Sequence, residues 1–179
     1  MGIKTMQYNI SFRDILYPRL EFKTGKLLLV LPRGSDPDEI MNKHKKWVAD
    51  KMDFIERCRK AALKKEIVKR TDEEFYDLVY NYQKNYSIEL KENLNRIFFR
   101  SMSTKWASCS PKRNLTINKK MQFLPGHLID YIILHEVTHL KHKRHNAEFW
   151  KIISSRFENY EELEKELFSY WFKLSEEKL

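Results

Sequence analysis

Short apolar and polar stretches alternate between residues 7 and 32, and this pattern predicts β-strands. Tyr17-Pro18 and Thr24-Gly25 are turn signals inside the region. We therefore expect residues 20–22 and 27–31 to form a hairpin. The second of these strands is a continuous apolar run, which is typical of a strand buried on both faces.

The following segment predicts a long helix. Residues 35–39 combine capping side chains, a proline suited to the first turn and N-terminal acids, so we expect a helix to start there. The same pattern extends the helix to about Lys65. Its apolar positions form one stripe, which consists of Ile40, Trp47, Phe54 and Ile55.

A second helix start lies at Thr71. Thr71 and Glu74 have the spacing of a capping box, and apolar residues follow them at helical spacing. We place a domain boundary near residues 66–71, just before this start. The chain is thereby expected to divide into N-terminal strands with a connecting helix at residues 1–66 and a second domain at residues 67–179.

Two more strands are expected in the second domain, at residues 96–101 and 113–118. Ser108, Ser110 and Pro111 lie between them and favour a turn. This arrangement predicts a hairpin formed by the two strands.

From Leu124 onward the apolar spacing becomes helical. Pro125 and Gly126 open a helix that should end near residues 140–141, and two further helices fit residues 146–157 and 160–175. The chain is therefore expected to have an α+β fold. A small sheet should pack on the helix of residues 125–140, after an N-terminal β-rich part and a long helix.

Composition agrees with a globular protein, because 42% of the 179 residues are hydrophobic and 13% are aromatic. The longest apolar run, Leu27 to Leu31, is too short to cross a bilayer, and the N-terminus lacks the profile of a secretory signal. The two cysteines, Cys58 and Cys109, are far apart and too few for a disulfide framework. We expect a cytoplasmic protein with no membrane partner, in which histidines and carboxylates would bind any zinc.

The net charge is +9 and the isoelectric point is near 9.4. A basic surface concentrates polyanions, so nucleic acid is a weakly indicated partner. A solvated helix face explains the same lysines and arginines without a ligand. No heptad repeat marks an oligomer interface, and the sequence leaves the oligomeric state open.

The main chemical feature of the chain is the run His135-Glu136-Val137-Thr138-His139 inside an apolar, helix-forming stretch. Residues four apart lie one above the other on a helix, so His135 and His139 can bind one zinc ion with Glu136 beside them. Zinc with three protein ligands keeps a position for water and lowers the pKa of that water. Glu136 is then the expected general base. The alternative is a helix with two histidines that bind no metal.

A third ligand has to come from outside the straight helix, and the nearby candidates are His142, His145 and Glu148. His142 would follow the helix past the metal, and we interpret it as an exposed loop residue. His145 lies six residues after His139, beyond a short basic break in which the chain has room to turn back. The spacing favours His145 over Glu148.

Several segments of this region are similar to the YgjP-like metallopeptidase family, which is related to the WLM and SprT-type zincins. The resemblance rests on residues 105–110 (KWASCS), 114–118 (NLTIN), 124–125 (LP), 129–139 (IDYIILHEVTH) and 145–150 (HNAEFW). It implies His135, His139 and His145 as zinc ligands and Glu136 as catalytic base. It also implies a peptide or protein substrate.

One position departs from the family, which usually has glycine where this chain has Ala107. An alanine makes the backbone of that loop less permissive and leaves the metal motif intact. Trp106 and Cys109 are interpreted as packing or substrate-rim residues, because a complete zinc motif needs no cysteine nucleophile. Zincins commonly bind an extended peptide along an edge strand, and residues 113–118 or 96–101 could serve that purpose.

Three functions are therefore considered. The first is a cytoplasmic zinc peptidase. The second is a nucleic-acid-associated zincin module for DNA-linked protein processing or restriction-related work, which the charge and the WLM and SprT-type relatives suggest. The third is a non-catalytic module in which zinc holds the fold, and it would require a closed site with four protein ligands.

Overall fold

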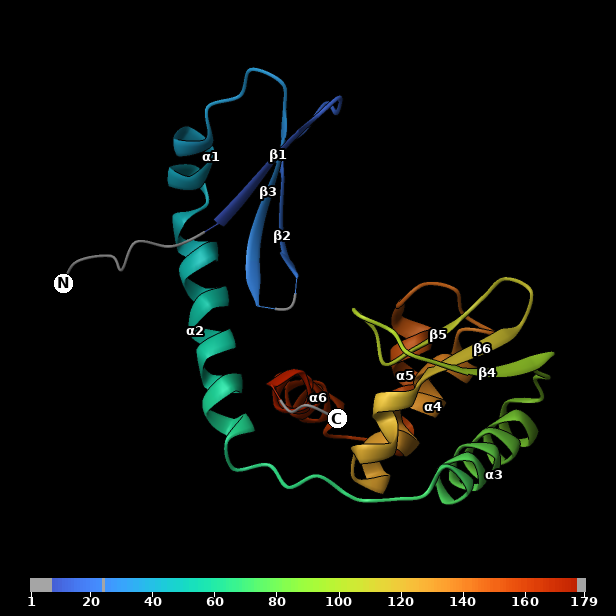
Figure 1. Ribbon diagram of the computed structural model, residues 1–179. Coiled ribbons are helices and arrows are strands. Elements are labelled where there is room, and N and C mark those ends of the chain that lie inside the picture. Colours follow the sequence, from blue (N-terminus) through green and yellow to red (C-terminus); the bar gives the residue numbers. More distant parts are fainter. Residues whose placement is uncertain (1–7, 24, 177–179) are drawn as a thin grey trace. The chain divides into compact units, whose positions relative to one another are not determined.

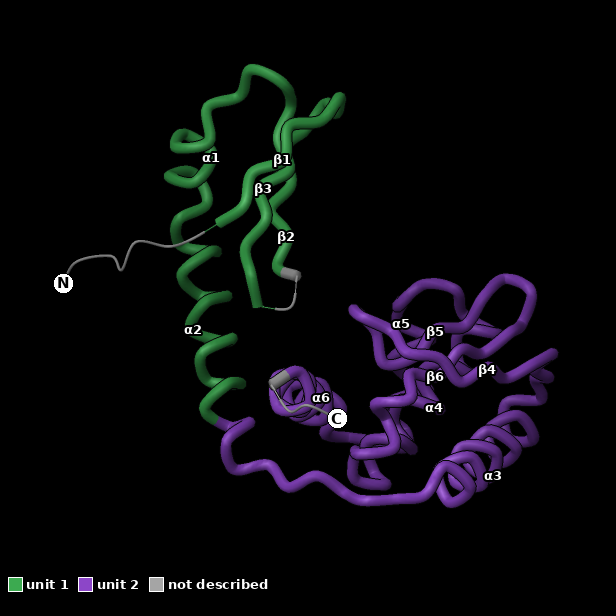
Figure 2. Tube along the Cα trace, viewed as in Figure 1, with its two compact units in different colours: residues 1–60 green, residues 61–179 purple. Residues whose placement is uncertain are grey.

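The computed structural model describes residues 8–23 and 25–176, which form an α+β protein with two small sheets and six α-helices (Figure 1). The chain divides into two compact units, residues 1–60 and 61–179 (Figure 2). The expected α+β class is therefore confirmed. Whether residues 1–66 and 67–179 are separate domains stays a prediction.

The sheet of unit 1 contains β1 (Tyr8–Arg13), β2 (Arg19–Lys23) and β3 (Lys26–Pro32) in the order β1-β3-β2. The expected hairpin is confirmed, because β2 and β3 are antiparallel neighbours. Thr24 of its turn lies outside the described residues. Leu29 and Val30 point to opposite faces of β3 and are both buried, as the continuous apolar run of this central strand predicted.

Two helices follow where one was expected, namely α1 (Pro37–Lys43) and α2 (Lys45–Ala62). The start is as expected, since the Asp36 carboxylate accepts a hydrogen bond from the backbone N–H of Asp38 at 2.9 Å. The single long helix is wrong because His44 leaves the helical region, with φ −106° and ψ 13°. No glycine or proline marks this break.

The break also changes the buried face of the second helix. Val48 is buried with Leu29 and Leu31 of the sheet, whereas Trp47 is 40% exposed and its ring lies 5.7 Å from that of Phe22, measured between centroids. The expected stripe is therefore wrong at Trp47, whereas Ile55 is buried and Ile40 packs against the core. A one-residue break rotates the second helix about its axis relative to the first, which an uninterrupted helical period cannot anticipate.

Unit 2 begins with α3 (Asp72–Leu90). The predicted capping box is present: the Thr71 hydroxyl accepts from the backbone N–H of Glu74 at 3.2 Å, and the Glu74 carboxylate accepts from the N–H of Thr71 at 2.8 Å. Phe75 and Val79 on this helix are buried in the core. The capping box therefore sets where the helix starts, and the apolar spacing sets its buried face.

The sheet of unit 2 has the order β4-β6-β5, with β4 (Arg96–Arg100), β5 (Ala107–Cys109) and β6 (Asn114–Asn118). The expected hairpin of residues 96–101 with 113–118 is wrong, because β4 and β6 are parallel. Parallel neighbours need a crossover connection, and the chain uses it to form β5, which is antiparallel to β6. A strand of three residues is too short to show an alternating pattern.

Four helical segments complete unit 2, namely the 3-10 helix η1 (Lys119–Phe123), α4 (Gly126–Thr138), α5 (Ala147–Arg156) and α6 (Tyr160–Glu176). The three α-helices lie where the sequence placed them. Most of α4 is buried, and it contacts α3, β5, α5 and α6. This helix is therefore the centre of the core of unit 2.

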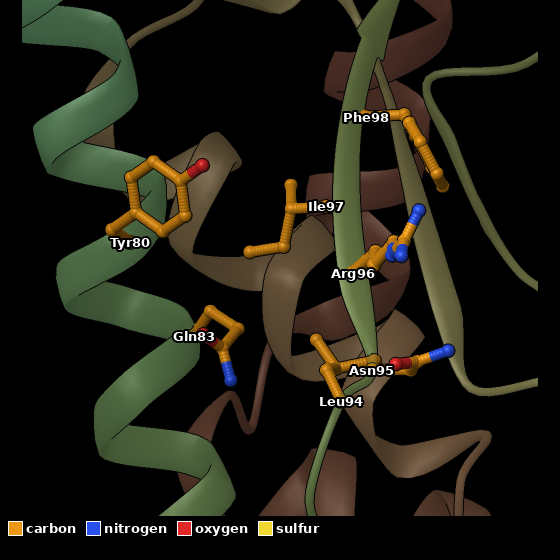
Figure 3. A pocket seen from close by; sticks show the side chains of 7 residues that line it. All are labelled: Tyr80, Gln83, Leu94, Asn95, Arg96, Ile97 and Phe98. Atoms are coloured by element: carbon orange, nitrogen blue, oxygen red, sulfur yellow. The ribbon is translucent and has the colours of Figure 1, made fainter.

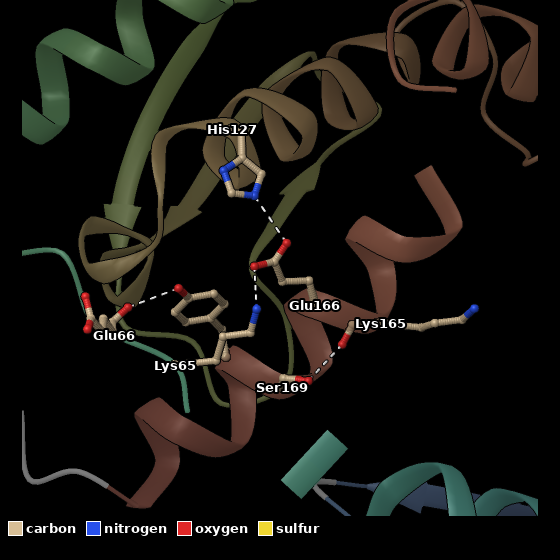
Figure 4. A network of polar contacts seen from close by, with 7 residues as sticks. Lys65, Glu66, His127, Lys165, Glu166 and Ser169 are labelled. Atoms are coloured by element: carbon tan, nitrogen blue, oxygen red, sulfur yellow. Dashed lines mark hydrogen bonds and ion pairs between the residues drawn. The ribbon is translucent and has the colours of Figure 1, made fainter. Parts of the chain in front are cut away.

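A polar network holds residues 65 and 66 against the helices (Figure 4). The Glu166 carboxylate on α6 accepts a bond from Lys65 Nζ at 2.6 Å, and its second oxygen lies 3.2 Å from His127 Nε2 on α4. The Tyr170 hydroxyl donates to the backbone carbonyl of Glu66 at 3.0 Å. These bonds fix the start of unit 2 to both α4 and α6.

A buried amide fixes the loop that leads into β5. Asn118 Nδ2 donates to the backbone carbonyls of Met102 at 2.9 Å and Lys105 at 2.8 Å, and the side chain has no exposed surface. The backbone N–H of Asn118 donates to the carbonyl of Trp106 at 2.8 Å. The end of β6 thus holds residues 102–106 in place, and with them the position of β5.

Asn118→Ala should lower the free energy of unfolding by about 2–3 kcal/mol, because it leaves buried carbonyls without donors. Denaturant unfolding measures the loss. Thr104→Ala is the control, since Thr104 is exposed in the same loop, and its effect should stay within about 0.5 kcal/mol. Equal losses in the two variants would contradict the role given to Asn118.

Candidate metal centre

Three histidine side chains meet at the C-terminal end of α4. Nε2 of His145 lies 3.0 Å from Nε2 of His135 and 3.1 Å from Nε2 of His139. Two nitrogens that bind one tetrahedral zinc ion at about 2.0–2.1 Å lie about 3.3 Å apart. The three imidazoles therefore fit a metal ion, and they form a group of possible ligand atoms.

The helix accounts for two of the three positions. His135 lies one turn before His139, so both rings project from the same side of α4. The helix ends at Thr138, whose hydroxyl donates to the Leu134 carbonyl at 2.7 Å. His139 is the C-cap residue and keeps a right-handed helical conformation, which preserves the spacing.

His145 lies just before α5, next to the N-cap residue Asn146. Asn146 caps this helix, because its side-chain oxygen accepts from the backbone N–H of Phe149 at 3.0 Å. The Phe149 ring is fully buried, and its centroid lies 4.6 Å from that of His145 and 4.9 Å from that of His135. Phe149 therefore packs against the histidine rings as a buried apolar contact, and this role was not foreseen from the sequence.

The other two candidates are placed differently. Glu148 is exposed on α5 and is not part of the converging group. His142 is half-buried, so its interpretation as an exposed loop residue is wrong. Its backbone carbonyl lies 3.1 Å from Nδ1 of His139. A donor at Nδ1 leaves the Nε2 lone pair of His139 free, as a metal ligand requires.

The environment keeps His135 and His139 neutral. Burial lowers the pKa of His135 to about 3, and the neighbouring His139 and His145 add to this effect. Burial also lowers the pKa of His139. Neutral imidazoles are the form that binds a metal, so His135 and His139 can act as ligands at neutral pH.

Glu136 lies beside the histidines on α4 and is only 9% exposed. Burial raises the pKa of its carboxyl to about 7, against the opposing effects of a hydrogen bond from the Cys109 backbone and the charge of Lys105. The edge strand β5 therefore contacts the carboxylate directly. This contact was not foreseen, because residues 108–111 were expected to form a turn.

Trp106 and Cys109 are half-buried side chains, and Cys109 lies beside Glu136. The ring of Trp106 packs edge-on against Trp171 of α6, at 4.9 Å between centroids. Burial raises the pKa of the Cys109 thiol to about 11, and the charge of Glu136 raises it further. A protonated thiol is a poor nucleophile, which agrees with a packing or rim role.

Comparison with known proteins points to one family. A family model described as "YgjP-like, metallopeptidase domain" matches residues 43–170. No curated protein matches the chain. None of the helices in the described residues is long and apolar enough to cross a membrane.

Two solved structures are similar to parts of the chain. The zymogen of abylysin, a metallopeptidase of Pyrococcus abyssi, is 21% identical over 51% of this chain and 93% of its own length, with a TM-score of 0.48. The zymogen of jannalysin, a metallopeptidase of Methanocaldococcus jannaschii, is 33% identical over 50% of this chain and 90% of its own length, with a TM-score of 0.44.

Alkylation of Cys109 should report the electrostatics of the site. Because only the thiolate reacts, the rate with iodoacetamide should rise with pH toward a midpoint near 11, above the ordinary thiol value of about 8.5. Glu136→Gln removes a negative charge and should therefore increase the rate at a given pH. Peptide mapping by mass spectrometry separates Cys109 from Cys58, and a midpoint at the ordinary value would contradict the expectation.

Proposed function

The chain belongs to the YgjP-like metallopeptidase family and is a metal-dependent hydrolase, and from this premise we propose that it hydrolyses peptide bonds in a zinc site formed by His135, His139 and His145. Glu136 is its general base. The observation that carries the proposal is that Nε2 of His145 lies 3.0 Å from Nε2 of His135 and 3.1 Å from Nε2 of His139, on a helix that also carries the buried carboxylate of Glu136.

The donor set favours zinc as the metal. Imidazole nitrogens bind zinc well, and catalytic zinc sites use three protein ligands and keep one position open. Among the described residues, no fourth histidine, cysteine or carboxylate joins the group. A structural zinc site usually has four protein ligands, so a group of three argues against that kind of site. When bound, zinc supplies a Lewis acid that lowers the pKa of water and polarises a carbonyl group.

Glu136 has the properties that proton transfer requires. A carboxylate whose pKa lies near neutrality can take a proton from the attacking water and later return it to the leaving amine. Burial supplies that pKa, and the backbone hydrogen bond from Cys109 holds the carboxylate in one orientation. The Glu136 side chain is thus both oriented and tuned by the residues that surround it.

The substrate main chain is proposed to lie along β5. The Trp106 carbonyl accepts from the N–H of Asn118, and the N–H of Ser110 donates to the Asn114 carbonyl, so even-numbered residues of this segment face β6. Backbone groups alternate sides along a strand, so those of Ala107 face the open edge. A peptide paired with Ala107 would pass beside Glu136.

This placement corrects the sequence-based candidates for the peptide-binding edge. Residues 114–118 form the central strand β6, whose two sides are both paired, so they cannot add a strand. Residues 96–100 do form an edge, but it is the edge opposite to β5. The backbone bond from Cys109 to Glu136 supports β5 as the peptide-binding edge, because it brings this strand beside the proposed base.

Glu136→Gln should lower peptide hydrolysis by at least about a hundredfold, because an amide cannot accept the proton. The zinc content of the variant should stay at the wild-type level, since Glu136 is not a proposed ligand. Hydrolysis of a quenched fluorescent peptide library and elemental analysis provide the two measurements. Glu148→Gln, an exposed change on α5, is the matched control. Full activity in Glu136→Gln would refute the proposed base.

His145→Ala should weaken zinc binding strongly, because it removes one of three metal bonds. His142→Ala should leave the affinity nearly unchanged, since the contribution of His142 comes from its backbone carbonyl, which alanine keeps. Zinc titrations with both variants need the same buffer, because ligand protonation makes the affinity depend on pH. Equal losses would show that the third ligand was assigned wrongly.

A further inference from the structure

The strand β4 forms the edge of the unit 2 sheet that is remote from the metal centre. Its one strand partner among the described residues is β6, and β5 lies on the other side of β6. Neighbouring strands are about 4.8 Å apart, so β4 is roughly 10 Å from the strand that contacts Glu136. A ligand at the β4 edge would therefore be separate from a substrate in the proposed cleft.

The free backbone groups of β4 can be assigned from the hydrogen bonds of β6. The carbonyl of Asn114 and the N–H of Asn118 bond to the segment of β5, so Leu115 and Ile117 of β6 face β4. In a parallel pair, a residue that faces the other strand bonds to the two neighbours of the residue opposite it. Because Ile97 and Phe99 lie opposite Leu115 and Ile117, their own N–H and C=O groups face outward. No described strand pairs with them, so this edge can accept a further strand.

A pocket runs along the same edge (Figure 3). Its volume is about 380 Å³, and it is lined by residues 94–98 together with Tyr80 and Gln83 of α3. Residues 96–98 are consecutive in β4 and point to alternating faces, so all of them can line one pocket only if it follows the strand edge. Figure 3 shows Ile97 pointing toward Tyr80, with Phe98 on the other side of the strand.

The edge carries positive charge without a described counterion. Arg96 and Arg100 are exposed, and neither forms an ion pair with any described residue. Both lie on the same face of the strand as Phe98, and the Arg100 guanidinium is 5.0 Å from the centre of the Phe98 ring. A strand added here would meet two cations on one face and the pocket beside Tyr80 on the other.

A second copy of the chain is a poor occupant. If two β4 strands paired antiparallel about Phe98, Arg96 of each copy would lie opposite Arg100 of the other. Like charges directly opposite each other destabilise a strand pair. The same arginines attract carboxylates, so the charge favours an acidic partner.

We propose that the open edge of β4 binds an extended acidic segment of a partner protein by strand addition. The segment alternates, with carboxylates opposite Arg96 and Arg100 and apolar side chains in the pocket beside Tyr80 and Gln83. Binding requires neither the metal centre nor peptide hydrolysis. The edge is thus a recognition site in addition to the cleft.

A dye-labelled peptide in which glutamate and valine alternate over about seven residues is a suitable probe. The full chain carrying Glu136→Gln should bind it, and fluorescence anisotropy should show weaker binding when salt is added. A peptide that alternates lysine and valine should bind at least about tenfold more weakly. Equal affinity for the two peptides, or no binding of the acidic one, would overturn the proposal.

Two substitutions of one residue test the backbone contact. Ile97→Ala and Ile97→Pro both remove the branched side chain, but only proline removes the outward N–H, and proline is tolerated where an edge N–H faces solvent. Ile97→Pro should bind the acidic peptide about fivefold to tenfold more weakly than Ile97→Ala, which corresponds to one lost backbone hydrogen bond. Equal affinities would show that the peptide does not add to β4.

Charge reversal tests the recognition. Arg96→Glu combined with Arg100→Glu should weaken binding of the acidic peptide at least about tenfold and should favour the lysine peptide instead. If these changes have no effect while Ala107→Pro abolishes binding, the peptide occupies the proposed cleft and the β4 site is refuted. A dimer in sedimentation experiments that Ile97→Pro dissociates would identify a second copy as the occupant.

Amide hydrogen exchange followed by NMR locates the bound peptide and checks the fold of every variant. Peptide binding should slow exchange at the N–H groups of Ile97 and Phe99, which face outward. The N–H groups of Phe98 and Arg100 face β6 and should be protected both with and without peptide. Loss of their protection identifies a variant whose sheet has not formed, and slowed exchange at Ala107 instead would overturn the assignment.

Discussion

Polar groups at the buried end of α4 impose the main constraint on unit 2. When a histidine or glutamate side chain is buried, it loses its hydrogen bonds to water, and other polar groups have to replace them. Glu136 does so through the backbone of Cys109, and His139 does so through the carbonyl of His142. The remaining imidazole nitrogens face one another, which is an arrangement that a cation stabilises. The apolar part of the helix anchors this polar end in the core.

The topology of the sheet places the strand β5 against that end of the helix. Because β4 and β6 are parallel, the chain between them has to return, and the return segment supplies β5. Asn118 then holds the loop before β5 by hydrogen bonds to two carbonyls. The sheet thus brings the backbone of residues 107–109 to the carboxylate, and the site depends on main-chain groups as well as on side chains.

The same topology gives the sheet two edges with different surroundings. The β5 edge lies beside Glu136 and a cysteine whose thiol has a raised pKa. The β4 edge lies beside α3 and carries two exposed arginines. One sheet can therefore offer one edge for chemistry and another for recognition, because each edge of a three-stranded sheet keeps its own free backbone groups.

Local patterns in the sequence determined the helices of unit 2, the capping box at Thr71 and the pairing of His135 with His139, because these depend on spacings of a few residues. Spacing also favoured His145 over Glu148, as the converging rings now support. Only the tertiary structure decided the parallel pairing of β4, the strand β5 and the break at His44. These depend on contacts between distant segments or on packing, and neither leaves a periodic signal in the chain.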